Sequence, residues 1–371
     1  MKVLVTGGGG FLGSAIVRQL VARGDTVRSL TRGHYPELDV LGVETVRGDM
    51  ADPDLTSRAV AGCDAVIHTA AKAGDWGPAA AYVRTNVEGT RCVLAAGRAA
   101  GVGRLVHTST PSVVHTGRDI AGADERLPYA TQFPAPYPAT KARAEQLVLA
   151  ANGPALATVA LRPHLIWGPG DTQLVPRIIE RGRQGRLRFV RGGDALIDST
   201  YVDNAAAAHL LALDRVAPGA ACAGRAYFIS QGEPRPLRDL VNAILAAAGL
   251  PPATAMLPFP VAYALGAALE VAFRVLRRAD EPPMTRFLAH QLATAHWFDI
   301  SAARRDLDYE PAVDINTGLE RLHHHLTATA LRAERTTWIG VPPATANVSI
   351  RHVARPAPDP RPAQILALHQ I

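Results

Sequence analysis

The chain has 371 residues, 48% of them hydrophobic, which is enough for about two domains with a substantial core. Its formal net charge of +6 does not predict nucleic-acid binding, because the arginines are scattered and only 5% of the residues are aromatic. Cys63, Cys92 and Cys222 are too widely spaced for a metal site or a disulfide framework, so we expect no metal and a cytoplasmic location. Neither an export signal nor an uninterrupted transmembrane span is expected.

An N-terminal apolar run that breaks into glycines is the first strong signal. Residues 3–6 predict a buried strand, residues 7–13 a tight loop and residues 14–20 an amphipathic helix. Glycines at this spacing let the backbone turn, approach a pyrophosphate and pack the helix close to the strand, while free helix amides face the anion. An ordinary strand-to-helix turn is the alternative. We expect a dinucleotide site that includes Gly7, Gly10, Phe11, Leu12 and Gly13.

The end of the second predicted strand, over residues 25–30, bears on the choice of cofactor. An acid at this point would bond the ribose 2′-hydroxyl of NAD. This chain instead has Thr31 followed by Arg32, which removes a repulsive carboxylate and supplies a guanidinium to pair with a 2′-phosphate. The pattern therefore favours NADP(H). A solvated surface arginine is the alternative, but it leaves the missing acid unexplained.

Strand and helix patterns alternate along the first half of the chain. Further strands are predicted over residues 44–49, 65–71 and 104–110, with a helix near residues 82–100. This alternation predicts an α/β fold, a Rossmann-type doubly wound parallel sheet with its ligand at the carboxyl ends of the strands. Asp49 at such an end can accept a hydrogen bond from the adenine amino group, or simply form a turn. The residues expected at the cofactor there are Asp49, Met50, Ala70 and Ala71.

Tyr137 and Lys141 are four residues apart in a predicted helix, so they share one face. A phenol with a pKa near 10 exchanges protons at neutral pH only when a cation stabilises its phenolate, and Lys141 supplies that cation. A hydroxyl from Ser109 or Thr110, at the end of the fifth strand, would hold the substrate oxygen. We predict these four residues to be catalytic. The alternative for the tyrosine and lysine is a surface pair.

These segments together resemble the extended short-chain dehydrogenases/reductases, most closely their 3β-hydroxysteroid dehydrogenase-like branch. The likeness extends to about residue 326 and implies that Asn86 and Pro163 belong to the cofactor site. Asn86 alone would be interpreted as a local backbone bridge. Thr110 aligns with the usual catalytic serine, which leaves open whether it or Ser109 acts. The segments that carry the resemblance are residues 6–13, 68–71, 108–110, 133–141, 148–153 and 161–163.

Within that branch, residues 33–38, 72–77 and 109–113 look most like bacterial 2-alkyl-3-oxoalkanoate reductases of long-chain olefin biosynthesis. The resemblance implies an NADPH-dependent ketoreductase that forms a 2-alkyl-3-hydroxyalkanoate, with hydride from the nicotinamide and a proton from Tyr137. The alternatives are a 3β-hydroxysteroid dehydrogenase-type sterol oxidoreductase, a nucleotide-sugar epimerase or dehydratase that retains NAD, and a nucleotide sensor without catalysis. The missing ribose acid disfavours the NAD enzymes, and a sensor would not need Tyr137 and Lys141.

The resemblance also implies a smaller, mostly helical C-terminal substrate domain. We expect residues 1–165, with a return near 198–230, to form the cofactor domain, and residues 166–197 and 231–330 to form the substrate domain. A lipid-like small-molecule substrate and a homo-oligomer are expected. Few polar groups occur in two segments expected to line the substrate pocket, residues 258–276 and 287–298.

Three further stretches lie towards the C-terminus. Residues 256–276 predict a core or pocket helix, with a seat at the bilayer interface as the alternative. For the protein as a whole, peripheral membrane or multienzyme association is the corresponding alternative. His323, His324 and His325 diverge in direction on a helix and so predict a solvated helix end and not a metal site. Residues 331–371 are rich in proline and have no apolar period, so we predict a disordered tail.

Overall fold

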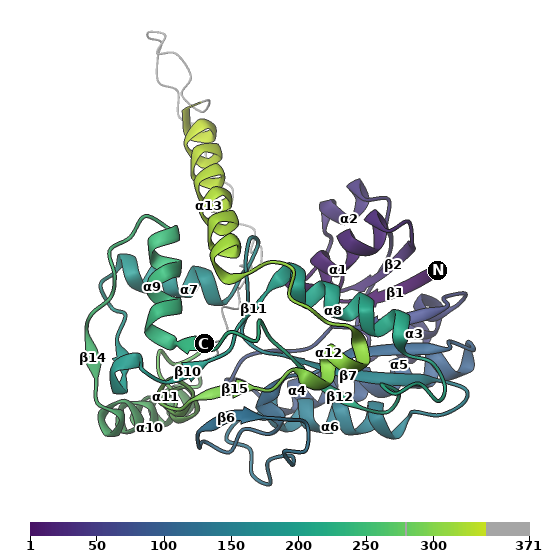
Figure 1. The fold of residues 1–371 in the computed structure, drawn as a ribbon, viewed down its shortest axis with the longest axis horizontal. Helices are drawn as coiled ribbons and strands as arrows, with labels where there is room; N and C mark the ends of the chain where they lie inside the picture. The colour runs from purple at the N-terminus through teal and green to yellow at the C-terminus, as the bar shows by residue number, and fades with distance from the viewer. Residues whose placement is uncertain (279, 339–371) are drawn as a thin grey trace, which may run out of the picture.

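The computed structural model describes residues 1–278 and 280–338, and at its centre lies one large parallel sheet (Figure 1). The strand order is β3-β2-β1-β4-β5-β7-β12, and every pairing is parallel. The order reverses between β1 and β4, which creates a crevice at the carboxyl ends of these two strands. The strands are β1 (Lys2–Thr6), β2 (Thr26–Thr31), β3 (Glu44–Arg47), β4 (Ala65–His68), β5 (Arg104–Thr108), β7 (Ala157–Pro163) and β12 (Ala226–Ile229).

Helices cover both faces of this sheet. One face packs against α1 (Phe11–Ala22) and α8 (Val202–Arg215), and the other against α3 (Pro53–Val60), α5 (Gly89–Ala99) and α6 (Pro136–Ala150). Side chains of β1 alternate between the two layers: Val3 and Val5 join one core cluster and Leu4 the other. All three are fully buried, as expected for a strand covered on both faces. The predicted doubly wound α/β fold is confirmed.

A second group of elements lies beyond the carboxyl ends of the strands. Its helices are α7 (Leu174–Arg183), α9 (Leu237–Ala247), α10 (Phe259–Val275) and α11 (Arg286–Ala293). A four-stranded sheet contains β13 (Arg235–Pro236), β10 (Leu196–Ile197), β15 (His296–Phe298) and β6 (Ile120–Ala123). Two-stranded pairs join β8 (Ile166–Trp167) to β11 (Thr200–Tyr201) and β9 (Phe189–Val190) to β14 (Met256–Leu257). Short elements complete the chain: α2 (Pro36–Val40), α4 (Ala79–Tyr82), the π-helix η1 (Val83–Glu88), the 3₁₀ helices η2 (Pro111–Val113) and η3 (Arg191–Gly193), and α12 (Ser301–Leu307).

Residues 198–230 return to the large sheet through two elements. Helix α8 covers one face of the sheet, and β12 pairs with β7 at its edge. The two-residue strand β11 pairs with β8 outside the large sheet and leads directly into α8. The division of the chain into cofactor and substrate domains stays a prediction.

The C-terminal helix α13 (Ile315–Trp338) is longer than the sequence predicts and projects from the body (Figure 1). It continues through residues 331–338, which were expected to begin the tail, because the first proline of that segment is Pro342. Its three adjacent histidines are exposed, as expected, but lie inside the helix and not at its end. The rest of the predicted tail, residues 339–371, lies outside the described residues.

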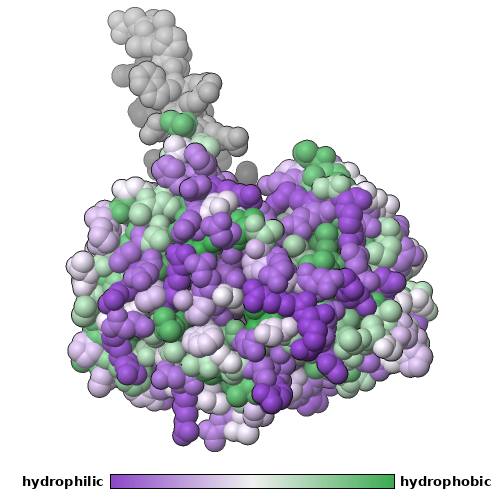
Figure 2. Space-filling view, viewed as in Figure 1, coloured by the Kyte–Doolittle hydropathy of each residue, from purple (hydrophilic) through white to green (hydrophobic). Residues whose placement is uncertain are grey.

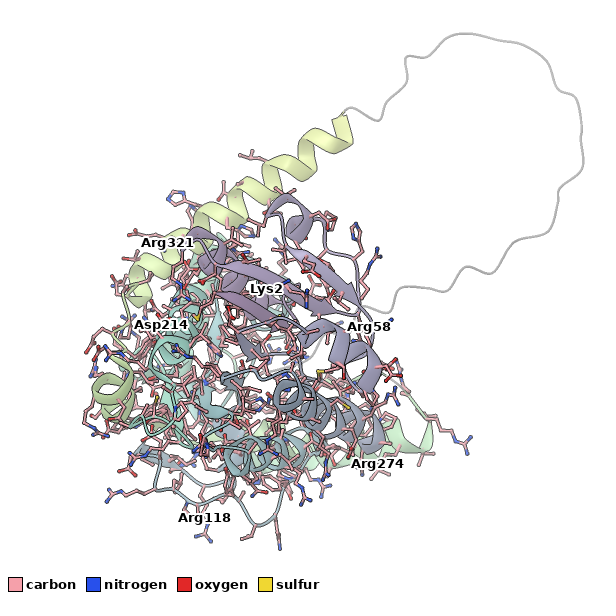
Figure 3. All side chains as sticks on the ribbon, turned by 90° about the vertical axis from the view of Figure 1, so that its right-hand side faces the viewer. Lys2, Arg58, Arg118, Asp214, Arg274 and Arg321 are labelled. Carbon is pink, nitrogen blue, oxygen red and sulfur yellow. The ribbon has the colours of Figure 1, made fainter. Side chains whose placement is uncertain are left out.

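Charged residues are distributed widely over the surface. Figure 2 shows hydrophilic side chains over much of one face, with hydrophobic ones interspersed. Arg321 of α13, labelled in Figure 3, pairs with Asp203 of α8 at 3.3 Å and so ties the projecting helix to the body. No helix in the described part of the chain is long and apolar enough to cross a membrane.

Candidate active site

A cavity of about 440 Å³ opens at the carboxyl ends of the parallel strands. Its walls come from the glycine loop, the ends of β2, β4, β5 and β7, the start of α6, residues 163–174 and one side of α11. Among the predicted site residues the cavity brings together Gly7, Gly10, Phe11, Leu12, Gly13, Arg32, Asp49, Met50, Ala70, Ala71, Ser109, Thr110, Tyr137, Lys141 and Pro163. Asn86 is the one predicted site residue that does not line it.

The glycine loop fits a dinucleotide pyrophosphate for steric reasons. Gly7 has φ +73°, and a Cβ there would lie 3.0 Å from the Cα of Ala70 on β4. A Cβ at Gly13 would overlap the carbonyl oxygen of Gly7, so glycine at this position allows α1 to pack against the loop. Gly10 is the N-cap of α1 and has no capping side chain, which leaves the first helix amides to face an anion in the cavity.

Polar contacts beneath the loop hold β1 and β4 in register. His68 of β4 contacts the Thr6 hydroxyl through Nδ1 at 2.8 Å and the Thr90 hydroxyl through Nε2 at 2.9 Å. Burial lowers the pKa of His68 to about 3, so the ring is neutral. The Thr6 hydroxyl also accepts from the Ala70 amide at 3.2 Å, which fixes the backbone of the cavity wall.

The end of β2 carries no carboxylate. Thr31 is buried and donates its hydroxyl hydrogen bond to the Gly33 carbonyl at 3.0 Å, and Arg32 is exposed at the cavity rim. Asp49, across the rim, accepts from the Ala51 amide at 3.0 Å and from Arg84 at 2.9 Å. The Ala51 hydrogen bond, followed by Arg84 and the charge of Arg32, keeps the pKa of Asp49 below its usual range despite partial burial.

Lys141 lies on α6, whose first residue is the favoured Pro136, and its ammonium group is buried. Its Nζ donates to the Thr108 carbonyl at 2.6 Å and lies 3.5 Å from Nε2 of His107. Burial lowers the pKa of Lys141 to about 8, and the charge of Glu145 opposes that shift. The lysine therefore remains mainly protonated at neutral pH, on the same helix as Tyr137 and against the same cavity.

The two candidate hydroxyls have different surroundings. The Ser109 side chain is buried beside Glu145 and contributes to lowering that carboxyl's pKa. Thr110 caps η2: its hydroxyl accepts from the Ser112 amide at 3.2 Å and donates to the Ser112 hydroxyl at 3.2 Å. Thr110 and Ser112 thus form a pair of hydroxyls on the cavity wall.

A buried ion pair fastens α6 to β7 behind the site. Arg162 donates to Glu145 through Nε at 3.0 Å and through a second nitrogen at 2.6 Å, and the Tyr129 hydroxyl donates to the same carboxylate at 2.6 Å. Burial would raise the pKa of Glu145, but Arg162 outweighs it and the pKa is lowered. Pro163 is the last residue of β7 and follows Arg162, so this pair fixes the distance between Lys141 on one element and the cavity wall on the other.

Asn86 lies behind the cavity in η1. Its amide accepts from the Lys72 backbone nitrogen at 2.7 Å and donates to the Lys72 carbonyl at 3.0 Å and to the Thr140 hydroxyl at 3.0 Å. It is therefore a local backbone bridge, the alternative that its position on an apolar helix favours. The bridge orients the loop of residues 72–77, and Ala73 and Asp75 of this loop line the cavity.

Sequence reasoning missed much of the distal wall. Residues after Pro163 could have been found, because they follow the carboxyl end of a strand. Of the two segments predicted to line the substrate pocket, residues 287–298 supply Phe287 and Gln291 of α11 to the cavity. The predicted pocket segment 258–276 contributes no lining residue, because the small and apolar positions of α10 pack on α11 or face outwards. The lining residues that were missed include Tyr35, Thr69, Asp75, Ser112, His164, Leu165, Ile166, Asp171, Gln173 and Leu174.

Comparison with known proteins identifies the family. A model described as the 3-beta hydroxysteroid dehydrogenase/isomerase family matches residues 4–261. The chain belongs to this family. The family resemblance predicted from the sequence is therefore confirmed, and the chain is an oxidoreductase of the nicotinamide-dependent, extended short-chain dehydrogenase/reductase type.

Relatives within and around the family are similar over most of the chain. A 2-alkyl-3-oxoalkanoate reductase of Stenotrophomonas maltophilia is 59% identical over 325 residues, which cover 87% of this chain and 98% of that protein. A protein of the same name from Shewanella oneidensis is 49% identical, covering 86% of this chain and 84% of its own. The solved structure of MoeE5 in complex with UDP-glucose and NAD has a TM-score of 0.68 at 25% identity, covering 89% of this chain and 100% of that one.

Proposed function

We propose that this protein is an NADPH-dependent ketoreductase that converts a 2-alkyl-3-oxoalkanoate into the 2-alkyl-3-hydroxyalkanoate. One observation carries the proposal: Tyr137, Lys141 and Thr110 meet the glycine loop around one cavity in a chain that is 59% identical to a reductase of that name. The substrate assignment rests on the two relatives that share this name.

Three side chains divide the work at the carbonyl group. The bound nicotinamide supplies the hydride to C3 of the substrate. Tyr137 donates its phenolic proton to the C3 oxygen, so that the carbonyl becomes a hydroxyl and the tyrosine becomes an anion. The buried ammonium group of Lys141 stabilises that anion. The Thr110 hydroxyl, which donates to Ser112 in the structure, turns its proton to the substrate oxygen and holds that oxygen in line. The surroundings of Ser109 and Thr110 favour Thr110 for this role.

The cofactor assignment follows from the glycine loop and from the end of β2. The amides at the start of α1 are suited to the pyrophosphate, in the space that a Cβ at Gly7 would reduce. Arg32 at the cavity rim, beside a threonine and not an acid, is suited to a 2′-phosphate. We therefore propose NADP(H), with Asp49 and Met50 near the adenine and Ala70, Ala71 and Pro163 along the rest of the cofactor.

The family name favours one alternative, oxidation of a 3β-hydroxysteroid. Leu165, Ile166, Leu174 and Phe287 give the distal cavity an apolar wall that suits either a flat steroid or an alkyl arm. A nucleotide-sugar epimerase or dehydratase activity is disfavoured. Such enzymes are expected to retain NAD, and the end of β2 offers no acid to the ribose of NAD.

A substrate panel tests the proposal directly. NADPH oxidation is followed at fixed enzyme concentration with 2-alkyl-3-oxo acids of increasing chain length, a 3-oxosteroid and a nucleotide sugar. We expect turnover of the oxo acids alone, with kcat/KM rising as the chains lengthen, because each buried methylene contributes about 0.8 kcal/mol. Turnover of the steroid without any oxo acid would establish the alternative.

Three broader assignments accompany this function. We propose that residues 1–165 and the return near 198–230 hold the cofactor while residues 166–197 and 231–330 hold the substrate, which limited proteolysis with and without NADPH tests. Cys63, Cys92 and Cys222 are free thiols, which supports a reducing, cytoplasmic location. A homo-oligomeric state stays a prediction, and light scattering measures it.

A further inference from the structure

Three buried histidines meet near Lys141 at the carboxyl ends of β4 and β5. They are His68 of β4, His107 of β5 and His209 of α8. Burial lowers the pKa of each ring, to about 3 in His68 and about 4 in His209, so all three rings are neutral at pH 7. A neutral imidazole has one N–H donor and one bare nitrogen acceptor, and its neighbours decide which nitrogen carries the proton. The tautomer of each ring therefore follows from its contacts.

The contacts of His68 place its proton on Nε2. The Thr90 hydroxyl donates its own proton to the Asn86 carbonyl at 2.6 Å, so it can only accept from Nε2 of His68, which lies 2.9 Å away. Nδ1 of His68 is then bare and accepts from the Thr6 hydroxyl at 2.8 Å. Both nitrogens of His68 are satisfied, and the ring joins β4 to β1 beneath the glycine loop.

His209 has the opposite tautomer. Its Nδ1 donates to the Ala205 carbonyl at 2.7 Å, one helical turn earlier in α8, so its proton lies on Nδ1. The bare Nε2 accepts from the Thr108 hydroxyl at 2.8 Å. Both nitrogens are again satisfied. This contact fixes the end of β5, where the Thr108 carbonyl accepts from the Lys141 ammonium group at 2.6 Å.

His107 differs from both, because only one of its nitrogens has a neighbour of the right kind. Nε2 lies 3.5 Å from Nζ of Lys141, and Nδ1 is buried without a hydrogen-bond partner among the described residues. A proton on Nε2 would point at the positively charged ammonium group, so electrostatics place the proton on Nδ1. A buried N–H without an acceptor is unfavourable, and an apolar side chain would fill the same space without it. The bare Nε2 therefore indicates a requirement other than packing.

That requirement is found in the hydrogen bonds of Lys141. An ammonium group has three N–H donors. The Thr108 carbonyl takes one of them, and Nε2 of His107 is placed to take a second. Both acceptors belong to β5, and Lys141 lines the cavity together with Tyr137, so the third N–H is left for the cavity. Two neutral acceptors orient the ammonium group without cancelling its charge, which a carboxylate in the same place would do.

We propose that His107 is a positioning residue of the proton-transfer site: held as its Nδ1–H tautomer, it accepts a hydrogen bond from the Lys141 ammonium group and so directs the remaining N–H into the cavity. Its effect on turnover rests on the proposed function, whereas the tautomer and the contact do not. The other ionisable groups around Lys141 come from three elements and are unchanged by substitution of His107. They are Tyr137 and Glu145 of α6, Arg162 of β7, which pairs with Glu145, and His68 of β4.

Nuclear magnetic resonance of the full-length protein tests the tautomer directly. The protein is labelled with ¹⁵N-histidine, and two-bond ¹H–¹⁵N correlations at pH 7 show which ring nitrogen carries the proton. His107→Gln and His68→Gln each remove one ring and so assign the signals. We expect a protonated Nδ1 in His107 and a protonated Nε2 in His68, which serves as the internal reference. A proton on Nε2 of His107, or on both of its nitrogens, would overturn the proposal.

The pKa of Lys141 gives a second readout that needs no turnover. The sequence has only three lysines, Lys2, Lys72 and Lys141, so ¹³C-lysine labelling gives three titrating signals. His107→Leu removes an acceptor and destabilises the ammonium group, so the pKa of Lys141 should fall by about 0.5 to 1. In His107→Gln the side-chain oxygen can replace Nε2, and the pKa should stay within about 0.3 of the wild-type value. His115→Leu, at a buried neutral histidine packed on Phe287, is the control and should leave it unchanged.

Turnover of a 2-alkyl-3-oxo acid separates positioning from packing. His107→Leu should lower kcat about tenfold with KM within about twofold, and His107→Gln should restore most of the loss. If both variants lower kcat equally and the pKa of Lys141 does not change, His107 acts only in packing and the proposal is wrong. If the leucine variant fails to fold, the wild-type tautomer and the glutamine variant still decide. If the wild type reduces no oxo acid, the proposed function fails while both resonance measurements still test the contact.

Discussion

The two sides of the cavity are built on opposite principles. On the α6 side, charged groups are buried and paired: Glu145 and Arg162 are almost inaccessible to solvent, and Lys141 lies next to them. On the α10 side, aliphatic groups are exposed, and the buried Glu270 pairs with Arg286, whose side chain is about half exposed. Burying charge and exposing apolar surface are both unfavourable, so each arrangement indicates a requirement other than stability.

The requirements differ between the two sides. Proton transfer at a carbonyl needs a fixed ammonium group and fixed hydroxyls, and a buried network supplies that precision. An exposed apolar stripe does not fix the position of any reacting group, but it offers apolar surface that a partner can bury. The cavity therefore has a rigid wall on the α6 side, which we call the chemical wall. Its wall on the α10 side has an exposed outer face that is open to a partner.

The largest effect is expected at the proton donor. Tyr137→Phe removes one hydroxyl and little contact area, so kcat should fall about 10³-fold while the NADPH dissociation constant stays within about twofold. Stopped-flow turnover and fluorescence titration measure the two quantities. Lys141→Ala should damage both, because the lysine is expected to contact the nicotinamide ribose as well as Tyr137. Near-normal turnover of Tyr137→Phe would exclude the proposed mechanism.

The contrast between the two ion pairs predicts the next effect. Glu145→Gln leaves the Arg162 guanidinium buried without its counter-charge, and should lower the free energy of unfolding by about 3–5 kcal/mol. Glu270→Gln should cost only about 1 kcal/mol, because Arg286 and Arg274 are roughly half exposed and water solvates them. Urea unfolding compares the two variants. Equal losses would mean that the two walls do not differ in the way described.

Within the chemical wall, loss of the Thr110 hydroxyl and loss of the Ser109 hydroxyl should have different effects on kcat. Thr110→Val should lower kcat about 10- to 100-fold, because its hydroxyl shares the cavity wall with Ser112, whereas Ser109→Ala should change kcat less than about threefold. Ser112→Ala is the matched control for loss of the Thr110 partner. If Ser109→Ala has the larger effect, the roles of the two residues are reversed.

Cofactor preference depends on an exposed residue, so its effect should be smaller. A charge-assisted contact contributes about 1.5–3 kcal/mol, or about one to two decades of discrimination. Thr31→Asp combined with Arg32→Gln should shift the ratio of kcat/KM values from NADPH towards NADH by that amount. Arg47→Gln, an exposed arginine on the neighbouring strand, is the control. Equal use of both cofactors by the native protein would refute the role given to Arg32.

The chemical wall was predictable from the sequence, and the distal wall largely was not. Gly7, Gly13, Tyr137 and Lys141 are constrained by local backbone sterics or by helical spacing, so a short window of sequence contains the signal. Phe287 and Gln291 were predicted only as part of an apolar pocket segment, residues 287–298, because the packing of α11 decides which of its side chains reach the cavity. The lining residues between His164 and Leu174 were not predicted at all.

The composition of α10 also explains why residues 258–276 were wrongly expected to line the pocket. Alanine and valine dominate α10, and such composition suits a pocket helix as well as an exposed one; only the buried Gly266 and Glu270 decide which side faces inwards. The end of α13 was predicted too early for a related reason. Residues 332–338 lack an apolar period, but a helix needs none where it leaves the body.

The smallest effect is the pH dependence of the reduction. Burial lowers the pKa of Lys141 to about 8, so raising the pH through this value removes the cation that stabilises the tyrosinate. The kcat/KM of reduction should be level near pH 7 and fall above pH 8 by at most tenfold per unit. Because the charge of Glu145 raises the lysine's pKa, Glu145→Gln should move the midpoint of that fall to lower pH, provided the variant is assayed below its unfolding temperature. Glu270→Gln, on the other wall, should leave the midpoint unchanged. A midpoint that stays near 10 in the wild type would show that Lys141 does not control the reaction.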